Sequence, residues 1–249
     1  GATLGQEPKM NKEIYFKSGK NRLFGRLYVP DAYDRGVVFL HGGGASTSIR
    51  YAYLQSECYK NNIASFAFDF RGCGKSEGIF SDGSLVNREI DTTNAISYFL
   101  TETKLDNSHF YLWGASMGAH VACKLLNTIN PYGVILQCAA AYGKEAENIP
   151  LNEEFTRIIR APGSWENSTV FDDLSKYQGK VLVVYGDKDT VIPEEVKVRY
   201  RDCFAPLAMT NYIELKGGAH SLLFPQNEEE KKALEKMTEV GISFIKNSP

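Results

Sequence analysis

The feature that most constrains this chain is an apolar run that leads straight into a glycine-flanked serine. Residues Phe110–Trp113 are all apolar, and the pentapeptide Gly114–Gly118 follows with Ser116 at its centre. A strand that enters Gly-x-Ser-x-Gly predicts a tight strand-to-helix turn that leaves the serine hydroxyl exposed. The flanking glycines let the strand and the next helix approach closely, because neither carries a side chain. We therefore expect a strand before Ser116, a helix from Met117, and a nucleophilic serine between them.

The rest of the chain alternates short apolar runs with segments of helical periodicity, which predicts a mostly parallel sheet flanked by helices. The first two strands are expected to form an antiparallel pair. The expected strands are Glu13–Phe16, Arg22–Val29, Val37–Leu40, Ala64–Phe70, Phe110–Trp113, Gly133–Leu136, Val181–Tyr185 and Asn211–Leu215. Helices are expected at Tyr51–Lys60, at Leu85–Leu100 and from Met117. Asn227 followed by three glutamates predicts the capped start of a final helix.

The length of 249 residues fits one α/β domain, which we expect over residues 10–249. Residues 1–9 are interpreted as an expression scar or a disordered tail before a start at Met10. Residues 141–178 contain no strong strand, although they are rich in aromatic and large apolar side chains. A long irregular connection of this kind is often a functional lid. We therefore expect a small cap insertion here that sits over Ser116.

Charge and cysteine content exclude several classes of protein. The formal net charge is −2, so nothing favours binding to nucleic acid or to an anionic membrane surface. The longest apolar run, Val134–Tyr142, is too short to span a bilayer, and we expect no stable membrane insertion. The five cysteines are scattered and form no C-x-x-C pair. This pattern predicts reduced thiols, no zinc site and a cytoplasmic protein.

Acid and imidazole groups follow two later strands in the order that a serine nucleophile needs. Acyl transfer by serine requires an imidazole to take its proton and a carboxylate to orient that imidazole. The strand Val181–Tyr185 is followed by Asp187 and Asp189, and His220 comes after the last strand. The order serine, acid, histidine at strand ends therefore predicts a catalytic triad with His220 as the general base.

Four motifs together resemble the α/β-hydrolase family of serine hydrolases, most closely its capped group. That group contains cinnamoyl (feruloyl) esterases, monoacylglycerol-lipase-like enzymes and serine aminopeptidase-like proteins. The motifs are His41–Gly44, Asp69–Gly78, Gly114–Gly118, and Gly186–Asp189 with His220. The resemblance implies the α/β-hydrolase fold.

The resemblance also implies roles for individual residues. It favours Asp189, three residues after Gly186, as the acid of the triad, while Asp187 is the alternative and otherwise braces the turn. The Met117 N–H, at the start of a helix, is expected to be one oxyanion donor. By resemblance the second donor is Gly43, with Gly44 as the alternative.

The remaining motif residues are expected to have structural roles. His41 is structural by resemblance, His120 is expected to pack or to support the site, and His109 should lie at the opposite end of the sheet. The segment Gly74–Ser76 resembles the tail of a phosphate-binding loop, but Asp69 stands where that loop requires glycine. A nucleotide site is therefore excluded, and Arg71 in this segment is expected to hold neighbouring loops.

The sequence thus predicts a serine carboxylesterase that acts on small or aromatic acyl esters through an acyl-enzyme intermediate. It needs no cofactor and no metal, and its partner is a small-molecule ester. Phe155 and Trp165 are candidates for lining the substrate pocket, or else for packing the cap onto the body. The alternatives are a monoacylglycerol-lipase-like enzyme, a peptidase, an acyltransferase or perhydrolase on the same scaffold, and a binding protein without activity. We expect a monomer or a homodimer.

Overall fold

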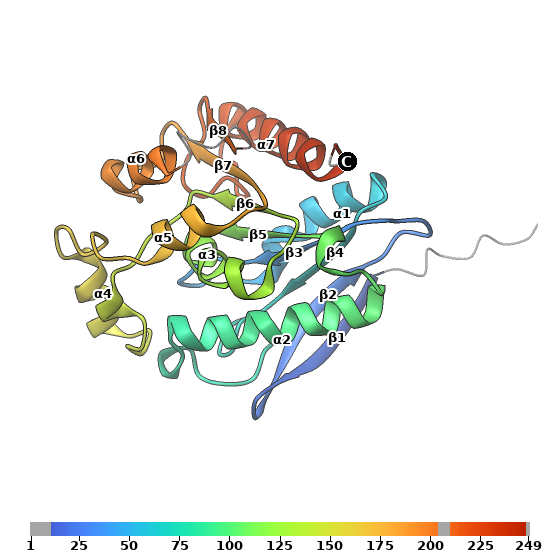
Figure 1. The fold of residues 1–249 in the computed structure, drawn as a ribbon, viewed down its shortest axis with the longest axis horizontal. Helices are drawn as coiled ribbons and strands as arrows, with labels where there is room; N and C mark the ends of the chain where they lie inside the picture. Colours follow the sequence, from blue (N-terminus) through green and yellow to red (C-terminus); the bar gives the residue numbers. More distant parts are fainter. Residues whose placement is uncertain (1–10, 204–209, 248–249) are drawn as a thin grey trace, which may run out of the picture.

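The computed structural model describes residues 11–203 and 210–247, where eight strands form one sheet in the order β1-β2-β4-β3-β5-β6-β7-β8 (Figure 1). The strands are β1 (Asn11–Ser18), β2 (Asn21–Tyr28), β3 (Gly36–Leu40), β4 (Ala64–Phe68), β5 (Phe110–Ala115), β6 (Gly133–Gln137), β7 (Lys180–Gly186) and β8 (Thr210–Leu215). β2 pairs antiparallel with both β1 and β4, and the other pairs are parallel. The predicted mostly parallel sheet is confirmed. The expected tail, residues 1–9, lies outside the described residues.

Helices cover both faces of the sheet (Figure 1). They are α1 (Ala52–Lys60), α2 (Leu85–Thr103), α3 (Met117–Ile129), α4 (Glu153–Arg160), α5 (Val170–Lys176), α6 (Glu194–Asp202) and α7 (Glu228–Lys246), with short 3₁₀ turns η1 (Ser48–Tyr51), η2 (Phe80–Asp82), η3 (Asn107–His109) and η4 (Lys144–Ala146). On one face α1 packs against α7, and on the other α3 packs against both α2 and α5. Two helical layers therefore enclose the sheet, as the alternating pattern of the sequence predicts.

The central strands are apolar because both of their faces are covered. Every residue of β3, β4 and β6 is buried, which explains why these strands are continuous rather than alternating apolar runs. Trp113 of β5 is completely buried against Gly241 of α7, where a side chain on the glycine would collide with the indole ring. The predicted cap of α7 is confirmed, since the Glu230 N–H donates to Asn227 Oδ1 at 2.8 Å. Among the described residues, no helix has the length and apolarity that crossing a bilayer requires.

The connection between β6 and β7 divides into two structurally different parts. Its first part contains η4 and α4, and α4 extends away from the sheet (Figure 1). Asn152 begins α4, and its Oδ1 accepts hydrogen bonds from the N–H groups of Glu154 and Phe155. The second part contains α5, which packs against α3 and has Phe171 and Leu174 among its buried residues. This part of residues 141–178 belongs to the helical layer rather than to a cover over Ser116.

Candidate active site

Ser116 sits on a strained turn between β5 and α3. Its backbone has φ 53° and ψ −115°, a conformation that non-glycine residues seldom adopt and that surrounding structure must enforce. The Ser116 N–H donates to the carbonyl oxygen of Gln137 on β6 at 2.9 Å. A side chain at Gly118 would collide with the carbonyl oxygen of Leu40 at the end of β3. The flanking glycines are therefore required by close backbone approach, as the motif predicts.

Three loops bring Ser116, His220 and Asp189 into one hydrogen-bonded series. His220 Nε2 lies 3.1 Å from Ser116 Oγ, and His220 Nδ1 lies 2.9 Å from Asp189 Oδ2. With its proton on Nδ1, the imidazole donates to the carboxylate and leaves Nε2 free to accept the serine proton. Ser116 follows β5, Asp189 follows β7, and His220 follows β8. The geometry is thus that of an activated nucleophile with an oriented base.

Asp189 is held as a buried carboxylate by several donors. Its Oδ1 accepts hydrogen bonds from the N–H groups of Val191 at 2.9 Å and Ile192 at 3.2 Å. Burial alone would raise the pKa of Asp189, but the hydrogen bond and charge of His220 and these two N–H groups outweigh it, and the net pKa is lowered. Asp187 lies elsewhere, because its Oδ1 accepts the Gly217 N–H at 2.8 Å and braces the loop that leads to His220.

The candidate oxyanion donors lie next to each other beside Ser116. Met117 is the first residue of α3, so its N–H has no acceptor within the helix. Gly43 follows β3, and a Cβ added to it would stand 2.8 Å from the Met117 Cε atom. Gly44 has φ +62° and is exposed, with open space where its side chain would be. Gly43, unlike Gly44, lines a cavity together with Ser116, so Gly43 and Met117 stay the candidate pair of donors.

The loop that carries Gly43 is anchored by His41 and by the buried Arg88. His41 Nδ1 donates to the Gly42 carbonyl at 2.8 Å, and its Nε2 accepts the Phe70 N–H at 3.1 Å. Burial, followed by the charge of Arg88, lowers the pKa of His41 well below its ordinary value, so the ring stays neutral. His41 is thus structural, as expected.

Arg88 belongs to none of the sequence motifs, although its side chain is hydrogen-bonded to the same loop. The Arg88 guanidinium donates to the carbonyl oxygens of His41 at 3.2 Å and Gly42 at 3.1 Å. It also lies 4.3 Å over the ring of Phe70. The sequence contains one signal for this role. Arg88 lies on the helix face of α2 that faces the core, three residues after the buried Leu85 and seven before the buried Ala95. A charged residue at such a position indicates a buried hydrogen-bonding role.

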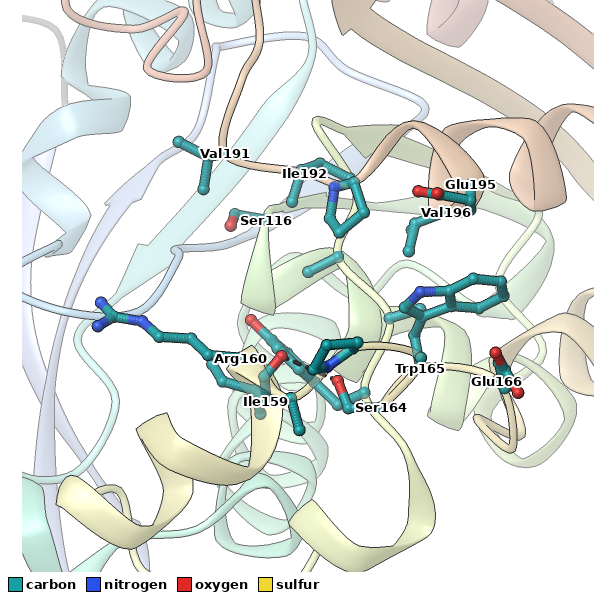
Figure 2. Close-up of a pocket in the computed structure, with 17 residues that line it drawn as sticks. Ser116, Ile159, Arg160, Ser164, Trp165, Glu166, Val191, Ile192, Glu195 and Val196 are labelled. Atoms are coloured by element: carbon teal, nitrogen blue, oxygen red, sulfur yellow. Dashed lines mark hydrogen bonds between the residues drawn. The ribbon is translucent and has the colours of Figure 1, made fainter.

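Two cavities have Ser116 as a common lining residue. The larger has a volume of about 590 Å³ and extends beneath residues 159–166 of the β6–β7 connection. In Figure 2 the residues Ile159, Arg160, Ser164 and Trp165 face Ile192 and other residues of the loop after β7. The smaller cavity, about 160 Å³, lies between the loop after β3 and the loop that carries His220.

The two aromatic residues expected to line the substrate pocket have different positions. Trp165 lines the larger cavity, as expected. Phe155 does not belong to the wall of either cavity: it is 4% exposed and packs in an apolar cluster with Met117 and Val121. Its ring contacts that of Tyr142 at a centroid distance of 5.7 Å. The pocket assignment of Phe155 is therefore corrected, because the apolar face of α4 turns it onto α3.

The remaining histidines lie outside the hydrogen-bonded series of Ser116. His120 is completely buried, its Nε2 lies 3.0 Å from Glu147 Oε1, and its Nδ1 accepts the Tyr142 N–H at 3.2 Å. His120 thus links α3 to the β6–β7 connection. His109 lies in η3, before the start of β5, and pairs with Asp106 at 2.7 Å. His120 thus has a supporting position, and His109 lies at the end of β5 opposite to Ser116, as the sequence predicts.

Arg71 holds the loop after β4 against α2, as expected. Its guanidinium pairs with Asp91 at 2.7 Å, and its N–H donates to the same carboxylate at 3.0 Å. Asp69 joins the neighbouring loops, since its carboxylate accepts the N–H groups of Ser48 and Lys75. The motif from Asp69 to Gly78 therefore joins neighbouring loops to α2 rather than forming a phosphate loop.

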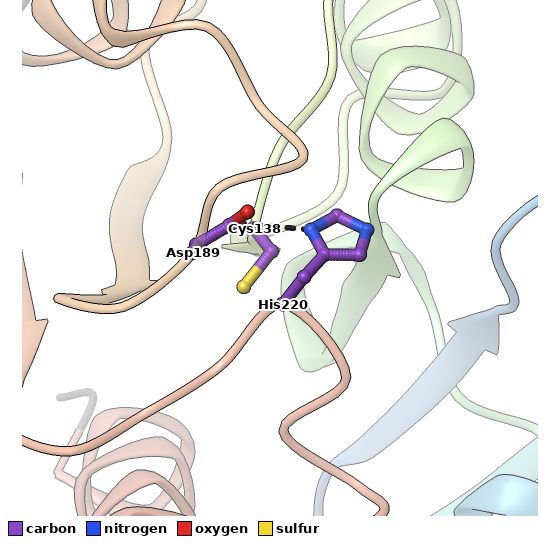
Figure 3. Close-up of side chains that lie close together, drawn as sticks. All are labelled: Cys138, Asp189 and His220. Carbon is purple, nitrogen blue, oxygen red and sulfur yellow. Dashed lines mark hydrogen bonds and ion pairs between the residues drawn. The ribbon is translucent and has the colours of Figure 1, made fainter.

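Within the described residues, one group of three side chains has the composition of a metal site. Sγ of Cys138, a carboxylate oxygen of Asp189 and a ring nitrogen of His220 all lie within 4.8 Å of one another (Figure 3). The Asp189 and His220 atoms are already hydrogen-bonded to each other. Burial, followed by the Asp189 charge, raises the pKa of the Cys138 thiol, which disfavours the thiolate that a metal needs. The donor set therefore suits the triad and fits a metal poorly.

Comparisons with known proteins agree with this fold and geometry. The model of the family described as serine aminopeptidase, S33, matches residues 32–164, just over half of the chain. The uncharacterized protein YfhR of Salmonella typhi is 28% identical over 213 residues, which cover 76% of this chain and 68% of YfhR. A multifunctional-autoprocessing repeats-in-toxin of Vibrio vulnificus is 30% identical over 124 residues, which are 46% of this chain and 2% of the toxin. The solved structure of Est1E from Butyrivibrio proteoclasticus with ferulic acid bound has a TM-score of 0.69 at 20% identity, over 93% of this chain and 99% of that chain, a likeness of fold.

Proposed function

Because the chain belongs to the α/β-hydrolase family described as serine aminopeptidase, S33, we propose that it is a serine carboxylesterase for small or aromatic acyl esters. The observation that carries this proposal is the series from Ser116 through His220 to Asp189, with contacts of 3.1 and 2.9 Å. In this arrangement a serine hydroxyl becomes a nucleophile at neutral pH. The strained Ser116 backbone supports the same role, because it turns the hydroxyl toward open space.

The proposed reaction has two halves that use the same proton relay. Ser116 Oγ attacks the acyl carbonyl while His220 Nε2 takes its proton, and the N–H groups of Gly43 and Met117 stabilise the oxyanion. His220 then protonates the departing alcohol as the acyl–oxygen bond breaks. Water next attacks the acyl-enzyme with His220 as base, and Ser116 regains its proton. The Asp189 carboxylate stays ionised throughout and stabilises the imidazolium.

The preference for small or aromatic acyl groups is inferred from the larger cavity. Its volume of about 590 Å³ lies within the range of small-molecule sites. Trp165, Ile192 and Val196 give it apolar walls on which a ring can stack. The solved fold relative Est1E, with ferulic acid bound, makes an aromatic acid a sensible first substrate. We also place the enzyme in the cytoplasm, since all five cysteines are free thiols.

The test is hydrolysis of a panel of esters by wild type, Ser116→Ala and the matched control Ser175→Ala. Ser175 is an exposed serine of α5 and lines neither of the two cavities that Ser116 lines. The panel contains p-nitrophenyl esters of short and long acids, a methyl hydroxycinnamate and an aminoacyl anilide. We expect cleavage of short and aromatic esters, a loss of at least about 10³-fold in kcat for Ser116→Ala, and no change for Ser175→Ala.

Other outcomes would contradict the proposal in distinct ways. A preference for long acyl chains would indicate a lipase, and cleavage of the anilide a peptidase. If a fluorophosphonate labels Ser116 but no ester is hydrolysed, the same nucleophile serves a transfer reaction. Hydrolysis by Ser116→Ala at the wild-type rate would remove the assignment altogether.

A further inference from the structure

Ser116 stands between two cavities whose walls differ in chemistry. The smaller cavity is bounded by the loop after β3, by η1 and by the loop that carries His220. Ser116 lines both cavities, whereas Gly43 and His220 line only the smaller one. An ester bound at Ser116 therefore has a separate compartment for each of its halves.

The position of His220 decides which half enters the smaller cavity. The leaving alcohol must receive a proton from His220 Nε2 as the tetrahedral intermediate collapses. Its oxygen must therefore lie on the His220 side of Ser116, in the cavity whose wall His220 forms. The acyl half then extends into the larger cavity beneath the β6–β7 connection. At about 160 Å³, the smaller cavity accommodates only a small alcohol.

Arg50 gives the smaller cavity a positive charge without a countercharge. Among the described residues that line it, Arg50 is the only lysine or arginine, and none is an aspartate or a glutamate. The half-buried guanidinium lies 4.5 Å over the ring of Phe224, which lines the same cavity. Within residues 11–203 and 210–247, no carboxylate forms an ion pair with Arg50.

A guanidinium held in this way is prepared to bind an anion. Stacking on an aromatic face orients the plane of the group and leaves the N–H donors at its edge available. Those donors match the two oxygens of a carboxylate in geometry and charge. The larger cavity differs, because its Arg160 is exposed and shares the wall with Glu166 and Glu195. A preference for an anion is therefore expected only in the smaller cavity.

We propose that the leaving group of the natural substrate is a small hydroxy acid whose carboxylate is bound by Arg50. The inference rests on the proposed esterase function and specifies its substrate as an ester between an apolar acid and a short hydroxy acid. In the step concerned, the acyl–oxygen bond breaks, His220 gives its proton to the departing hydroxyl oxygen, and the acyl group stays on Ser116. Arg50 takes no part in proton transfer and determines specificity.

The experiment compares two esters of one acid that differ only in charge, the glycolate ester and the glycolamide ester. The measured quantity is the ratio of kcat/KM for the glycolate ester to that for the glycolamide ester. For a half-exposed charge pair we expect wild type to favour the glycolate ester roughly tenfold, or about 1.4 kcal/mol. Arg50→Gln should lower the ratio to about 1, and Arg50→Lys should keep part of it. Arg157→Gln, which removes the same charge from an exposed position of α4, should leave the ratio unchanged.

Each result has a definite meaning. The ratio is taken within one preparation, so a partly unfolded variant does not disturb it. If both esters are hydrolysed with dependence on Ser116 and Arg50→Gln keeps the wild-type ratio, the inference is overturned while the esterase function stands. A wild-type preference for the neutral ester would overturn it equally. If wild type hydrolyses neither these esters nor the panel above, the esterase function fails and the inference fails with it.

Discussion

Replacing Asp189 with asparagine removes one charge and one acceptor from a carboxylate whose two oxygens are both in use. Oδ2 accepts from His220 Nδ1 at 2.9 Å, and Oδ1 accepts from the N–H groups of Val191 and Ile192 at 2.9 and 3.2 Å. Asparagine offers one oxygen and one NH₂ group, so it satisfies only one of these sides. With its oxygen on the two backbone N–H groups, the NH₂ group faces the imidazole. His220 must then carry its proton on Nε2, where it cannot accept the proton of Ser116.

The size of the effect follows from this change of tautomer. A triad imidazole held in the wrong tautomer loses about 10⁴-fold in kcat, which corresponds to about 5 kcal/mol of transition-state stabilisation at 1.36 kcal/mol per decade. The fold loses less, because one hydrogen bond to a charged group contributes about 1.5–3 kcal/mol. Asp189→Asn should therefore fold, bind substrate with a similar KM, and turn over very slowly.

The matched control is Asp187→Asn, which makes the same chemical change two residues earlier. Asp187 accepts a hydrogen bond from the Gly217 N–H at 2.8 Å, whereas the imidazole is hydrogen-bonded to Asp189. We expect its kcat to stay within about tenfold of wild type, with a stability loss of about 1 kcal/mol. The assay is steady-state hydrolysis of a p-nitrophenyl ester, with urea unfolding of each variant. A greater loss of kcat in Asp187→Asn than in Asp189→Asn would refute the assignment of the acid.

Two further predictions concern stability. Burial, followed by the charge of Glu147, raises the pKa of Glu89 to about 7. Since the unfolded value is about 4.3, the neutral form stabilises the fold below pH 4 and this contribution is lost as the pH rises through 7. The loss in the free energy of unfolding is about 1 kcal/mol for a partly exposed group, and Glu89→Gln should abolish it. Urea unfolding of both proteins at pH 5 and 8 measures this difference. An unchanged pH dependence in Glu89→Gln would contradict the prediction. Phe155→Ala should lower the free energy of unfolding by about 3 kcal/mol, and Phe155→Leu should lower it less. Neither substitution should change KM for small esters. A raised KM at unchanged stability would return Phe155 to the cavity wall.

The strands and the order of the site residues are predictable from the sequence for a simple reason. Buried parallel strands must be apolar throughout, so each appears as a short run whose end is visible. Residues just after such runs lie at one edge of the sheet, which is why Ser116, Asp189 and His220 meet although 73 positions separate the first two in a chain of 249 residues. The resemblance to the family favours Asp189 over Asp187, although only the hydrogen bonds show which one reaches His220.

Contacts between distant segments were not predictable in the same way. Phe155 belongs to an amphipathic segment, but no pattern in the sequence tells whether its apolar face meets a substrate or α3. The structure shows that it packs beside Met117. Arg50 likewise belongs to no motif, and its position beside Phe224 depends on how two loops 174 residues apart fold together. Such pairings are set by tertiary packing, which a local pattern does not encode.

The precision of the candidate site depends on charged groups outside the triad. Arg88 donates to the carbonyl groups of the loop that carries Gly43, at 3.1 and 3.2 Å. The buried Lys197 of α6 donates to the Asp189 carbonyl oxygen at 2.6 Å. Loops have no ladder of backbone hydrogen bonds, so a buried charge that finds its partner only in one loop conformation selects that conformation. The geometry of the candidate site is therefore the joint product of strand ends, which the sequence shows, and of these anchoring groups, which it does not.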